Sequence, residues 1–570
     1  MWCLGLGGSK FHDASACLFH DNQLVFFVEE ERLSRIRHAI GQLPFLSVLS
    51  CLDFAGITLK DIDIITFSWN PYYPNEIYEL SFDDPAILKI FPETVYGLCK
   101  ARIFVIDHQL SHASSAFRTS GFKKAIVISA DGSGDGKSLA VYRGENNQLI
   151  PLKTYDSTQS LGWFFQRITS YLGLGNWQHA GKTMALAALG EPCFNFDFFS
   201  IDHDGFHFNY EGIKPVKETE NLSVKMLQSF YRKHKSILYG KFKEIGVLQC
   251  DNQIKIDRMT GNRIYRHPTH KMCNLAASAQ LLIEKALLSV VKKYTAEQEM
   301  DSVCIAGGVA MNCKAIGELS KNVDNVKQIY VPPFAGDMGG AIGSVLEVLS
   351  SNGLKGSFEL RHAFWGHGFE DEEIQSYLKH LGISSQYIDN PSDCAAEIIG
   401  KGKIIGWYQG RMEIGPRALG NRSILAKADE KAIADYINIE IKNRETWRPF
   451  SPSTLESFLH EAWHLPEFAS EYMTTALQGK DNLKNLEGIR HFDNTSRVQK
   501  VNPEYSERFA ALIERIGQIA TNPVVLNTSL NLRNMPVVCK PAEAVQVFFS
   551  TPIDALIIGR NLLLKDKIFR

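Results

Sequence analysis

Short apolar runs separated by polar turns open the chain. Residues 14–19 and 24–28 are apolar and flank a four-residue polar turn, which is the pattern of a β-hairpin, and residues 1–10 read as an earlier core strand. Residues 29–37 then change to a charged pattern with helical spacing, and an apolar helical stripe follows over 43–56. The pattern predicts three strands and then helix.

The alternation continues further along the chain. Apolar runs predict strands at 62–67, 103–106, 125–130, 138–142 and 303–305. Amphipathic stretches predict helices at 161–172 and 275–293. Strands that alternate with helices predict an α/β protein, in which functional sites collect at the ends of strands.

A second unit is predicted after residue 350. The chain has 570 residues, more than the roughly 250–300 at which single cores stop growing, and its composition turns to Ser, Asn, Gly and Lys near 350–360. We therefore expect domains at 1–350 and 351–570. The second has a predicted strand, a Gly- and Arg-rich loop, a helix and another strand at 403–409, 410–422, 430–441 and 523–527.

Residues 194–270 lack sustained periodicity. They read as an insertion or a region that faces substrate, rather than as a core layer.

Composition excludes several classes of protein. The net charge of −2 supplies no global field toward nucleic acid or an anionic membrane. The eleven cysteines are scattered without Cys-x-x-Cys pairs, which favours reduced thiols and a cytoplasmic location. No signal-peptide pattern opens the chain, and Glu284 and Lys285 interrupt its longest apolar helical segment, so no transmembrane helix is expected.

His108 and His112 lie four residues apart beside small Ala and Ser side chains. On a helix they share one face and supply half of a transition-metal site. No Glu follows His108, so the zinc-protease pattern is absent. A chance pair of solvated or hydrogen-bonded histidines is the alternative.

The pair needs acidic partners. Asp131 and Asp337 lie in Gly-rich loops expected at the same edge of the sheet, and two imidazoles with carboxylates suit Fe(II), Mn or Zn. The competing interpretation makes both aspartates turn residues that accept hydrogen bonds from local backbone N–H groups.

Gly-rich loops follow three predicted strands, at 5–8, 131–136 and 307–308. Such loops can cradle phosphate oxygens with backbone N–H groups. Their arrangement over roughly the first 345 residues resembles the ASKHA nucleotide-binding architecture of actin, sugar kinases and Hsp70-type ATPases. The stretch 180–183 ends like a P-loop, but Gly175 precedes Gly181 by one residue too many for a Walker motif.

Six motifs spread over nearly the whole chain resemble those of the NodU-type O-carbamoyltransferases, which modify nodulation factors, antibiotics and related natural products. They are FHDASA at 11–16, EEER at 29–32, HQLSHA at 108–113, GPRALG at 415–420, WRPF at 447–450 and NTSLN at 527–531.

The resemblance implies two coupled active sites. An N-terminal ASKHA-type domain, like the iron-containing threonylcarbamoyl-transferases, would pass a carbamoyl group to a hydroxyl. A C-terminal YrdC-like α/β domain would convert carbamoyl phosphate and ATP, with Mg²⁺, to O-carbamoyladenylate. The implied metal ligands are His108, His112, Asp131 and Asp337, with Fe(II) as the expected ion. The implied nucleotide contacts are Asp131, Gly132, Lys182, Gly307, Gly308 and Asn312.

In the second domain the resemblance assigns phosphate and carbamoyl binding to Arg417, Lys442, Arg448, Arg497, Asn527 and Ser529. The chemistry suits these residue types, because planar guanidinium groups bind phosphate oxygens bidentately and offset accumulating negative charge. The alternative is a set of ordinary surface arginines.

His12 is predicted as the group that removes the proton of the attacking alcohol, since an imidazole titrates near neutrality. Asp13 beside it and Lys182 are included among the predicted catalytic residues. His12 and His38 are expected to meet the acceptor. Two positions depart from the family pattern: Gln109 replaces a second histidine, and HAGKT at 179–183 replaces the usual NPGKL.

The predicted partner is a small hydroxylated acceptor, with neither nucleic acid nor membrane, and a homodimer is left open. Residues 68–100 and 194–270 are expected to contact the acceptor. A tRNA threonylcarbamoyl-transfer protein or an ASKHA-type phosphotransferase is the alternative enzyme, although the neutral charge argues against an RNA substrate. A nucleotide-gated binding protein without catalysis is the non-enzymatic alternative.

Overall fold

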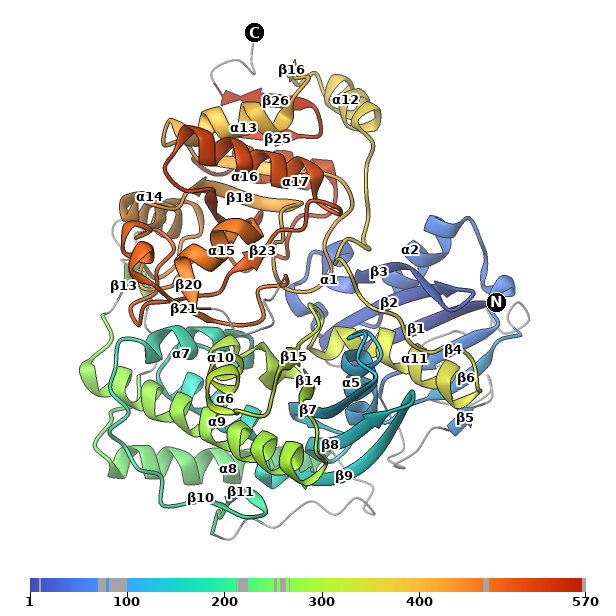
Figure 1. Ribbon diagram of the computed structural model, residues 1–570, viewed down its shortest axis with the longest axis vertical. Coiled ribbons are helices and arrows are strands. Elements are labelled where there is room, and N and C mark those ends of the chain that lie inside the picture. The colour runs from blue at the N-terminus through green and yellow to red at the C-terminus, as the bar shows by residue number, and fades with distance from the viewer. Residues whose placement is uncertain are drawn as a thin grey trace.

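The computed structural model describes residues 1–9, 12–69, 78–80, 100–211, 213, 224–250, 254–256, 263–265, 267–464 and 471–565. It is a mixed α/β protein, as the alternation of strand and helix patterns predicted (Figure 1). The ASKHA and YrdC assignments and the boundary near residue 350 stay predictions.

The first sheet has six strands. In sheet order they are β3 (Gln23–Glu29), β2 (His12–His20), β1 (Trp2–Ser9), β4 (Ile64–Phe67), β6 (Arg102–Val105) and β5 (Tyr78–Leu80). Strands β1, β2 and β3 form an antiparallel meander, and β4 and β6 run parallel to β1. The predicted hairpin is confirmed, and the short helix α1 (Glu30–Ser34) follows it.

The second sheet repeats this plan. In sheet order its strands are β9 (Gln148–Asp156), β8 (Lys137–Glu145), β7 (Lys124–Gly134), β14 (Ser302–Ala306) and β15 (Gln328–Tyr330). An antiparallel meander of the first three strands is again extended by two parallel strands beyond its first member.

Two helices pack against each other between these sheets. Helix α5 (His108–Phe117) follows the first sheet but packs on β7 and β14 of the second, whereas α11 (Gly340–Ser351) follows the second sheet but packs on β1 and β4 of the first (Figure 1). Gly343 of α11 allows close contact, because a Cβ there would lie 1.9 Å from the carbonyl oxygen of Ser111. The crossing brings the beginnings of both helices close to the ends of the strands.

The period-2 pattern of the strands explains why both sheet faces are covered. Ile126 and Ile128 of β7 face α6 (Leu161–Tyr171) and α9 (His270–Glu297), while Ala125 and Val127 face α5. Among the described residues α9 is the one helix long and apolar enough to cross a membrane, and 67% of its apolar window is buried inside the protein.

The described part of 194–270 contributes to the core, which the sequence interpretation did not expect. Phe206 and Phe208 of β11 (Gly205–Phe208), with Phe196 and Phe198 before it, are buried against α6. Aromatic residues at a spacing of two point to the same side of an extended chain, so the short length of these segments hid their periodicity.

A third sheet lies in the last third of the chain. Its strands, in sheet order, are β16 (Gln386–Tyr387), β26 (Asn561–Leu564), β25 (Ala555–Ile558), β17 (Ile405–Tyr408), β18 (Arg422–Lys427), β24 (Val524–Ser529), β19 (Ser451–Thr454) and β23 (Gln499–Lys500). Helices α13 (Pro391–Gly400) and α16 (Glu507–Ile519) cover one face, and α17 (Pro541–Phe549) packs on the other.

The predicted helix 430–441 is present in two parts. Helix α14 (Lys431–Tyr436) continues as a π-helical turn, Ile437–Ile441, and the backbone N–H of Lys442 donates to the carbonyl of Ile437. A π-turn is uncommon and is often found at functional sites. It presents Lys442 as the helix ends.

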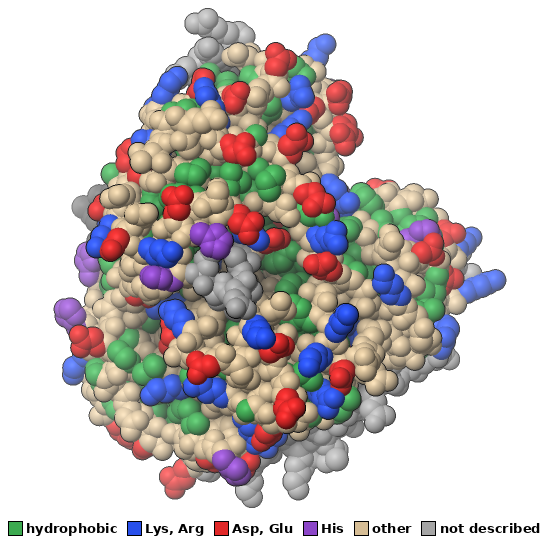
Figure 2. Space-filling model, in the orientation of Figure 1, with side chains coloured by type: hydrophobic (Ala, Val, Ile, Leu, Met, Phe, Trp, Pro, Cys, Tyr) green, Lys and Arg blue, Asp and Glu red, His purple; other side chains and the backbone are tan. Residues whose placement is uncertain are grey.

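Charges of both signs are interspersed over the face of the molecule in Figure 2. This agrees with the net charge of −2.

Candidate active site and metal centre

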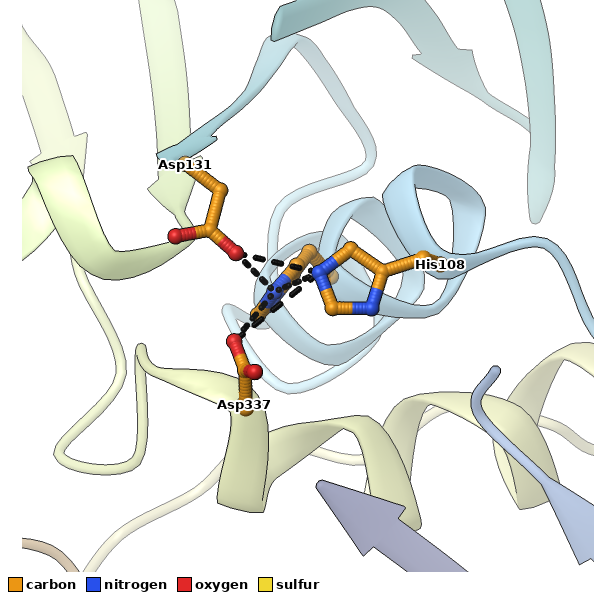
Figure 3. A group of neighbouring side chains, drawn as sticks. His108, Asp131 and Asp337 are labelled. Atoms are coloured by element: carbon orange, nitrogen blue, oxygen red, sulfur yellow. Dashed lines mark hydrogen bonds and ion pairs between the residues drawn. The ribbon is translucent and has the colours of Figure 1, made fainter. Parts of the chain in front are cut away.

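Four predicted ligands converge where α5 and α11 begin (Figure 3). His108, His112, Asp131 and Asp337 each offer one ligand atom, and these atoms all lie within 4.8 Å of one another. The Nε2 atom of His108 is 3.0 Å from Asp131 Oδ2 and 3.1 Å from the Nε2 atom of His112. Asp337 Oδ1 is 3.5 Å from His112 Nε2 and 3.8 Å from His108 Nε2.

Local sequence explains the position of the histidine pair. Asp107 caps α5 by accepting from the backbone N–H of Leu110 at 3.0 Å, so the helix begins at His108 and both imidazoles lie on one face. Asp135 accepts from the backbone N–H of His108 at 2.9 Å. A Cβ at Gly134 would lie 2.0 Å from the imidazole ring of His108, so only glycine permits this approach of β7 to α5.

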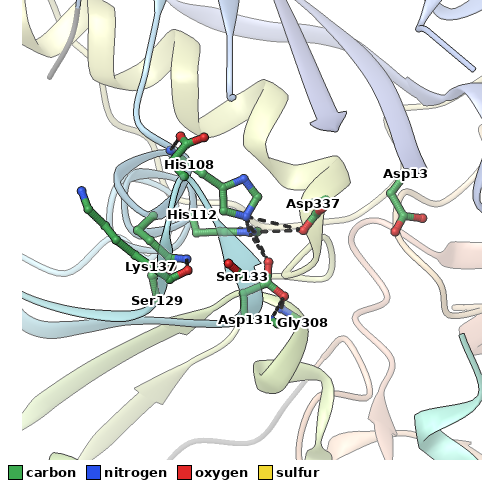
Figure 4. Close-up of polar contacts among 12 residues, drawn as sticks. Asp13, His108, His112, Ser129, Asp131, Ser133, Lys137, Gly308 and Asp337 are labelled. Atoms are coloured by element: carbon green, nitrogen blue, oxygen red, sulfur yellow. Dashed lines mark hydrogen bonds and ion pairs between the residues drawn. The ribbon is translucent and has the colours of Figure 1, made fainter. Parts of the chain in front are cut away.

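The Gly-rich loops hold the carboxylate of Asp131 (Figure 4). Its Oδ1 atom accepts from the backbone N–H of Gly132 at 2.7 Å and of Gly308 at 3.2 Å, which leaves Oδ2 facing the histidines. Gly307 has a φ of 90°, and a Cβ at Gly308 would lie 2.7 Å from Asp131 Oδ1. In this structure these glycines therefore orient a metal ligand.

The carboxylates of Asp131 and Asp337 favour a positive charge between the four predicted ligands. Burial opposes a charged His108, but the hydrogen bond to Asp131 and the charges of Asp337 and Asp131 outweigh it and raise the His108 pKa to about 10. Burial likewise opposes the charge on Asp131, but the hydrogen bonds to His108 and His112 hold its pKa well below the ordinary value. The two carboxylates thus favour a positive charge on the histidine pair.

The donor set fits a divalent transition metal. Metal–ligand bonds of about 2.1 Å separate neighbouring ligands by about 3.0–3.4 Å in octahedral or tetrahedral geometry. The four closest contacts, between 3.0 and 3.5 Å, match that separation. Imidazole nitrogen with carboxylate oxygen suits Fe(II), Mn or Zn, and His112 and Asp337 are buried, so the ligands would hold an ion out of bulk water.

His12 and His38 share one carboxylate beside this group. Asp13 Oδ2 accepts from His12 Nδ1 at 3.1 Å and Asp13 Oδ1 accepts from His38 Nδ1 at 2.7 Å. His12 Nδ1 is also 3.6 Å from Asp337 Oδ2, so the pair borders the candidate metal centre. Asp13 and His38 have φ values of 56° and 59°, a backbone region rare for non-glycine residues and often associated with function.

The shared carboxylate alters the ionisation of His12. Burial lowers its pKa, but the hydrogen bond to Asp13 and the charges of Asp337 and Asp131 outweigh burial and raise it to about 9. Burial raises the pKa of Asp13, but its hydrogen bonds to His12 and His38 lower it to about 2. Asp13 is therefore a permanent acceptor that orients both rings.

Lys182 and Asn312 do not touch the metal group. Lys182 Nζ is 3.0 Å from Glu445 Oε1, a buried ion pair between α7 (Ala180–Ala187) and the loop after the π-turn. The side chain of Asn312 caps α10 (Cys313–Asn322) and exchanges two amide hydrogen bonds with Gln280, at 2.9 and 3.0 Å.

A second cluster gathers cations from the last third of the chain. Burial and the neighbouring charges of Arg497 and Arg448 lower the pKa of Arg417 to about 9, and burial lowers that of Arg448 to about 10. Arg497 donates to Ser451 Oγ, and Trp447, beside Arg448, packs against the core of the second sheet. These guanidinium groups therefore lie together where the third sheet meets the rest of the protein.

Lys442, Asn527 and Ser529 border this cluster. Lys442 Nζ donates to Asn531 Oδ1 at 2.7 Å and to the backbone oxygen of Ser529, and burial holds its pKa well below the ordinary value. Asn527 donates to Ser453 Oγ at 2.9 Å, whereas its buried Oδ1 lacks a hydrogen-bond partner within the described segments. Buried cations held by neutral groups make a site for an anion.

Sequence reasoning missed two neighbours of the predicted residues. Trp177 lies over both His12 and His38, with ring centroids 4.3 and 4.9 Å away, and Glu445 is the partner of Lys182. Both stand close to family motifs, in the stretch before HAGKT and immediately before TWRPF. Of the regions predicted to contact the acceptor, residues 70–77, 81–99, 212, 214–223, 251–253, 257–262 and 266, with Phe11 of the first motif, lie outside the described residues.

Comparisons with known proteins agree with this organisation. A model described as carbamoyltransferase N-terminus matches residues 3–93 and 95–346, and one described as carbamoyltransferase C-terminus matches 396–565. Nodulation protein NolNO of Sinorhizobium fredii is 32% identical, over 99% of this chain and 83% of that protein. The 3'-hydroxymethylcephem-O-carbamoyltransferase of Amycolatopsis lactamdurans is 27% identical over 96% of both chains.

Among solved structures, full-length HypF in its phosphate- and nucleotide-bound form aligns with a TM-score of 0.38 and 12% identity, over 62% of this chain and 47% of that chain. The two family models together span nearly the whole sequence in the expected order. The chain belongs to the carbamoyltransferase family that includes the nodulation proteins and the cephem O-carbamoyltransferase.

Proposed function

We propose that this protein is an ATP- and metal-dependent O-carbamoyltransferase that modifies a hydroxyl of a small natural product. The observation that carries the proposal is the presence of two different sites in one chain. One is an arginine cluster suited to phosphates, beside the ion pair of Lys182 and Glu445, and the other is a histidine–aspartate site suited to proton removal.

The arginine cluster suits activation of the carbamoyl group. Water would split carbamoyl phosphate into phosphate and carbamate, and a carbamate oxygen would then displace pyrophosphate from the α-phosphorus of ATP to give carbamoyladenylate. Negative charge accumulates in both steps. Arg417, Arg448 and Arg497 are desolvated guanidinium groups, so they can offset that charge strongly. A bound anion would favour the protonated form of Lys442, whose pKa burial lowers. Mg²⁺ would accompany ATP.

The histidine–aspartate site suits transfer. Asp13 holds the Nδ1–H of His12, so the unprotonated imidazole offers Nε2 to take the proton of the acceptor hydroxyl. Because the His12 pKa is raised to about 9, this form is favoured at alkaline pH. The alcohol oxygen attacks the carbamoyl carbon, the bond to the adenylate phosphate oxygen breaks, and AMP leaves. Trp177 packs against both rings, tilted to His12 and edge-on to His38, and shields them from water on one side.

A metal held by His108, His112, Asp131 and Asp337 would polarise the carbamoyl carbonyl, and we propose Fe(II) as that ion. These residues fix where it would bind, since Asp131 is oriented by two backbone N–H groups and the imidazoles by α5.

The repeated strand order supports an ASKHA-type N-terminal part. Two sheets with the same antiparallel meander and parallel extension, and crossed helices between them, are what the predicted actin-like architecture requires. We propose in addition that the eight-stranded part is a YrdC-like unit that forms the adenylate. Its Arg- and Lys-lined surface supports that assignment.

The experiment is incubation of the purified, metal-replete protein under reducing conditions with carbamoyl phosphate, ATP and Mg²⁺. Release of pyrophosphate and formation of carbamoyladenylate are expected. Arg448→Ala should stop both, because it removes a buried cation of the cluster, whereas Arg490→Ala, an exposed arginine of the same part of the chain, should change neither. Absence of pyrophosphate and adenylate from the wild type would sink the proposal.

A further inference from the structure

The loop that carries Arg417 is gripped from the N-terminal part of the chain by two side chains of the EEER motif. Glu29 Oε1 accepts from the backbone N–H of Gly415 at 2.8 Å, and Arg32 Nη2 donates to the backbone oxygen of Gly415 at 2.8 Å. Both side chains are buried, at 4% and 2% exposure. The backbone of one loop residue is therefore held at both its N–H and its carbonyl oxygen.

Gly415 is suited to this grip. Its φ is 89°, and a Cβ there would lie 2.1 Å from the carbonyl oxygen of Pro333. On the far side of Arg417, the buried Glu413 Oε1 accepts from the backbone N–H groups of Leu419 at 2.7 Å and Arg422 at 3.2 Å. Arg417 therefore lies between two anchored residues. Gly415 is held by side chains of the N-terminal part, and Leu419 is held by Glu413 of the same loop.

Arg32 is also linked, through Glu31, to the histidines. Arg32 Nη1 is 3.0 Å from Glu31 Oε1, and Glu31 Oε2 accepts from the backbone N–H of His38 at 2.6 Å. His38 Nδ1 is then 2.7 Å from Asp13, which holds His12. A continuous set of hydrogen bonds and ion pairs thus joins the Arg417 loop to His12.

We propose that Arg32 is a positioning residue that, with Glu29 and Glu31, fixes the Arg417 loop and the His38–Asp13–His12 group relative to each other. The inference rests on the proposed function for what each end does, but the contacts themselves do not depend on it. Arginine is required because one planar guanidinium reaches Glu29, Glu31 and the Gly415 oxygen together, which a lysine ammonium on its flexible stem cannot do.

The test uses three variants of the full chain. Arg32→Lys keeps the charge but loses the fork, whereas Glu31→Met removes the links of Glu31 to His38 and to Arg32 Nη1 and leaves the contacts of Arg32 and Glu29 with Gly415 in place. Arg35→Lys is the matched control, because the Arg35 side chain also joins the two parts by donating to the backbone oxygens of Val537 and Pro536 at 2.7 and 2.9 Å. Arg35 touches Glu31 only through its backbone N–H, which donates to the Glu31 carbonyl at 3.0 Å and which the substitution leaves in place. Thermal unfolding establishes that each variant is folded.

Two readouts separate the two ends of the network. The first is the KM for carbamoyl phosphate in the pyrophosphate assay. The second is the rate at which diethyl pyrocarbonate acylates His38 and His12, located by mass spectrometry, which needs no activity. Arg32→Lys should raise the KM and the acylation rates about tenfold each, which is the equivalent of one lost charge-assisted hydrogen bond. Glu31→Met should raise only the acylation rates, and Arg35→Lys should change neither.

Wild-type acylation rates in folded Glu31→Met and Arg32→Lys would overturn the inference. Equal effects of Arg35→Lys and Arg32→Lys on both readouts would also overturn it, because any contact between the two parts would then suffice. If the wild type releases no pyrophosphate, the proposed function fails, while the acylation rates still decide whether Arg32 positions the histidines.

Discussion

At the scale of single residues, the proposed base for carbamoyl transfer is His12. Its Nδ1–H is held by a carboxylate whose backbone is in a left-handed conformation. This arrangement follows the general plan in which a buried acid orients an imidazole for proton removal. Asp13 serves two rings at once, so His38 also depends on it.

His12→Asn should leave adenylate formation unchanged and abolish carbamoyl transfer. Asparagine keeps a polar group beside Asp13 but cannot take a proton, and the arginine cluster is not altered. Pyrophosphate release and AMP release, measured separately with carbamoyl phosphate and ATP, distinguish the two steps. Loss of pyrophosphate release in a folded His12→Asn protein would contradict the division of labour.

The ligand histidines make metal binding depend on pH. With its pKa raised to about 10, His108 is protonated at neutral pH in the metal-free protein, and His112, whose pKa is also raised, competes in the same sense. A metal must displace those protons, so affinity should rise with pH from 6 to 9 and binding should release about one to two protons. Calorimetry in buffers of different ionisation enthalpy measures the protons released, and a pH-independent affinity would contradict the assignment.

The raised pKa of His108 also makes the stability of the metal-free protein depend on pH. Because the His108 pKa is raised from its ordinary value of 6.5 to about 10, its stabilising contribution is present below 6.5 and is lost as pH rises toward 10. The unfolding temperature of the metal-free protein, prepared with a chelator, should therefore fall between about pH 7 and 9.5. The unfolding temperature of the metal-loaded protein should fall less, because the ion takes the place of the protons. Equal losses with and without metal would show that other groups dominate.

At the scale of elements, the site depends on close contacts between strands and helices. Gly134 lets the end of β7 reach the ring of His108, and Gly343 lets α11 reach α5. A helix pattern at 275–293 or a hairpin over 14–28 is local, so the sequence predicted such elements within a few residues. The contacts between distant elements depend on packing, which local periodicity does not encode.

Gly134→Ala should weaken metal binding while the protein stays folded. A Cβ would meet the His108 ring at 2.0 Å, so the ring or the strand must shift by more than an ångström. Displacement of one ligand should cost about tenfold or more in metal affinity. Gly240→Ala in α8 (Val224–Glu244) is the control, because its Cβ would meet nothing within 4 Å and alanine is the better helix former. Equal metal affinity in the two variants would refute the role of Gly134.

The candidate site shows the same limit of prediction. His108 and His112 could be paired from their spacing, and the Gly-rich loops expected at the same sheet edge suggested Asp131 and Asp337 as partners. The structure brings these four residues together. Trp177 could not be paired with His12 from the sequence, because 165 positions separate them and no periodicity relates a loop tryptophan to a strand histidine. Contacts of this kind are fixed only when the sheets assemble.

At the scale of the whole molecule, a buried ion pair joins α7 of the N-terminal part to the arginine cluster of the last third of the chain. Glu445 is the carboxylate recorded beside Lys182 and Arg448, in a region where burial lowers the pKa of several arginines. It therefore offsets cationic repulsion as well as pairing with Lys182.

Glu445→Gln should destabilise the free protein more than Lys182→Met. The first change leaves Lys182 buried among arginines, whereas the second leaves Glu445 close to Arg448. Breaking a buried pair costs about 3 kcal/mol, and the repulsive surroundings add to it. Inorganic phosphate or pyrophosphate should restore the unfolding temperature of Glu445→Gln more than that of Lys182→Met. The opposite order would mean that the cluster does not attract anions.

Because α5 and α11 cross, the candidate metal centre takes its residues from both of the two similar sheet-and-helix units. His108 begins the helix after the first sheet and pairs with Asp131 at the β7–β8 hairpin of the second, while Asp337 precedes the helix after the second sheet and faces His12 at the β1–β2 hairpin of the first. Each half therefore contributes one helix start and one hairpin, and neither holds a complete site. Separation of the halves would break both cross pairs together, so the group could hold a metal only while the two halves stay together.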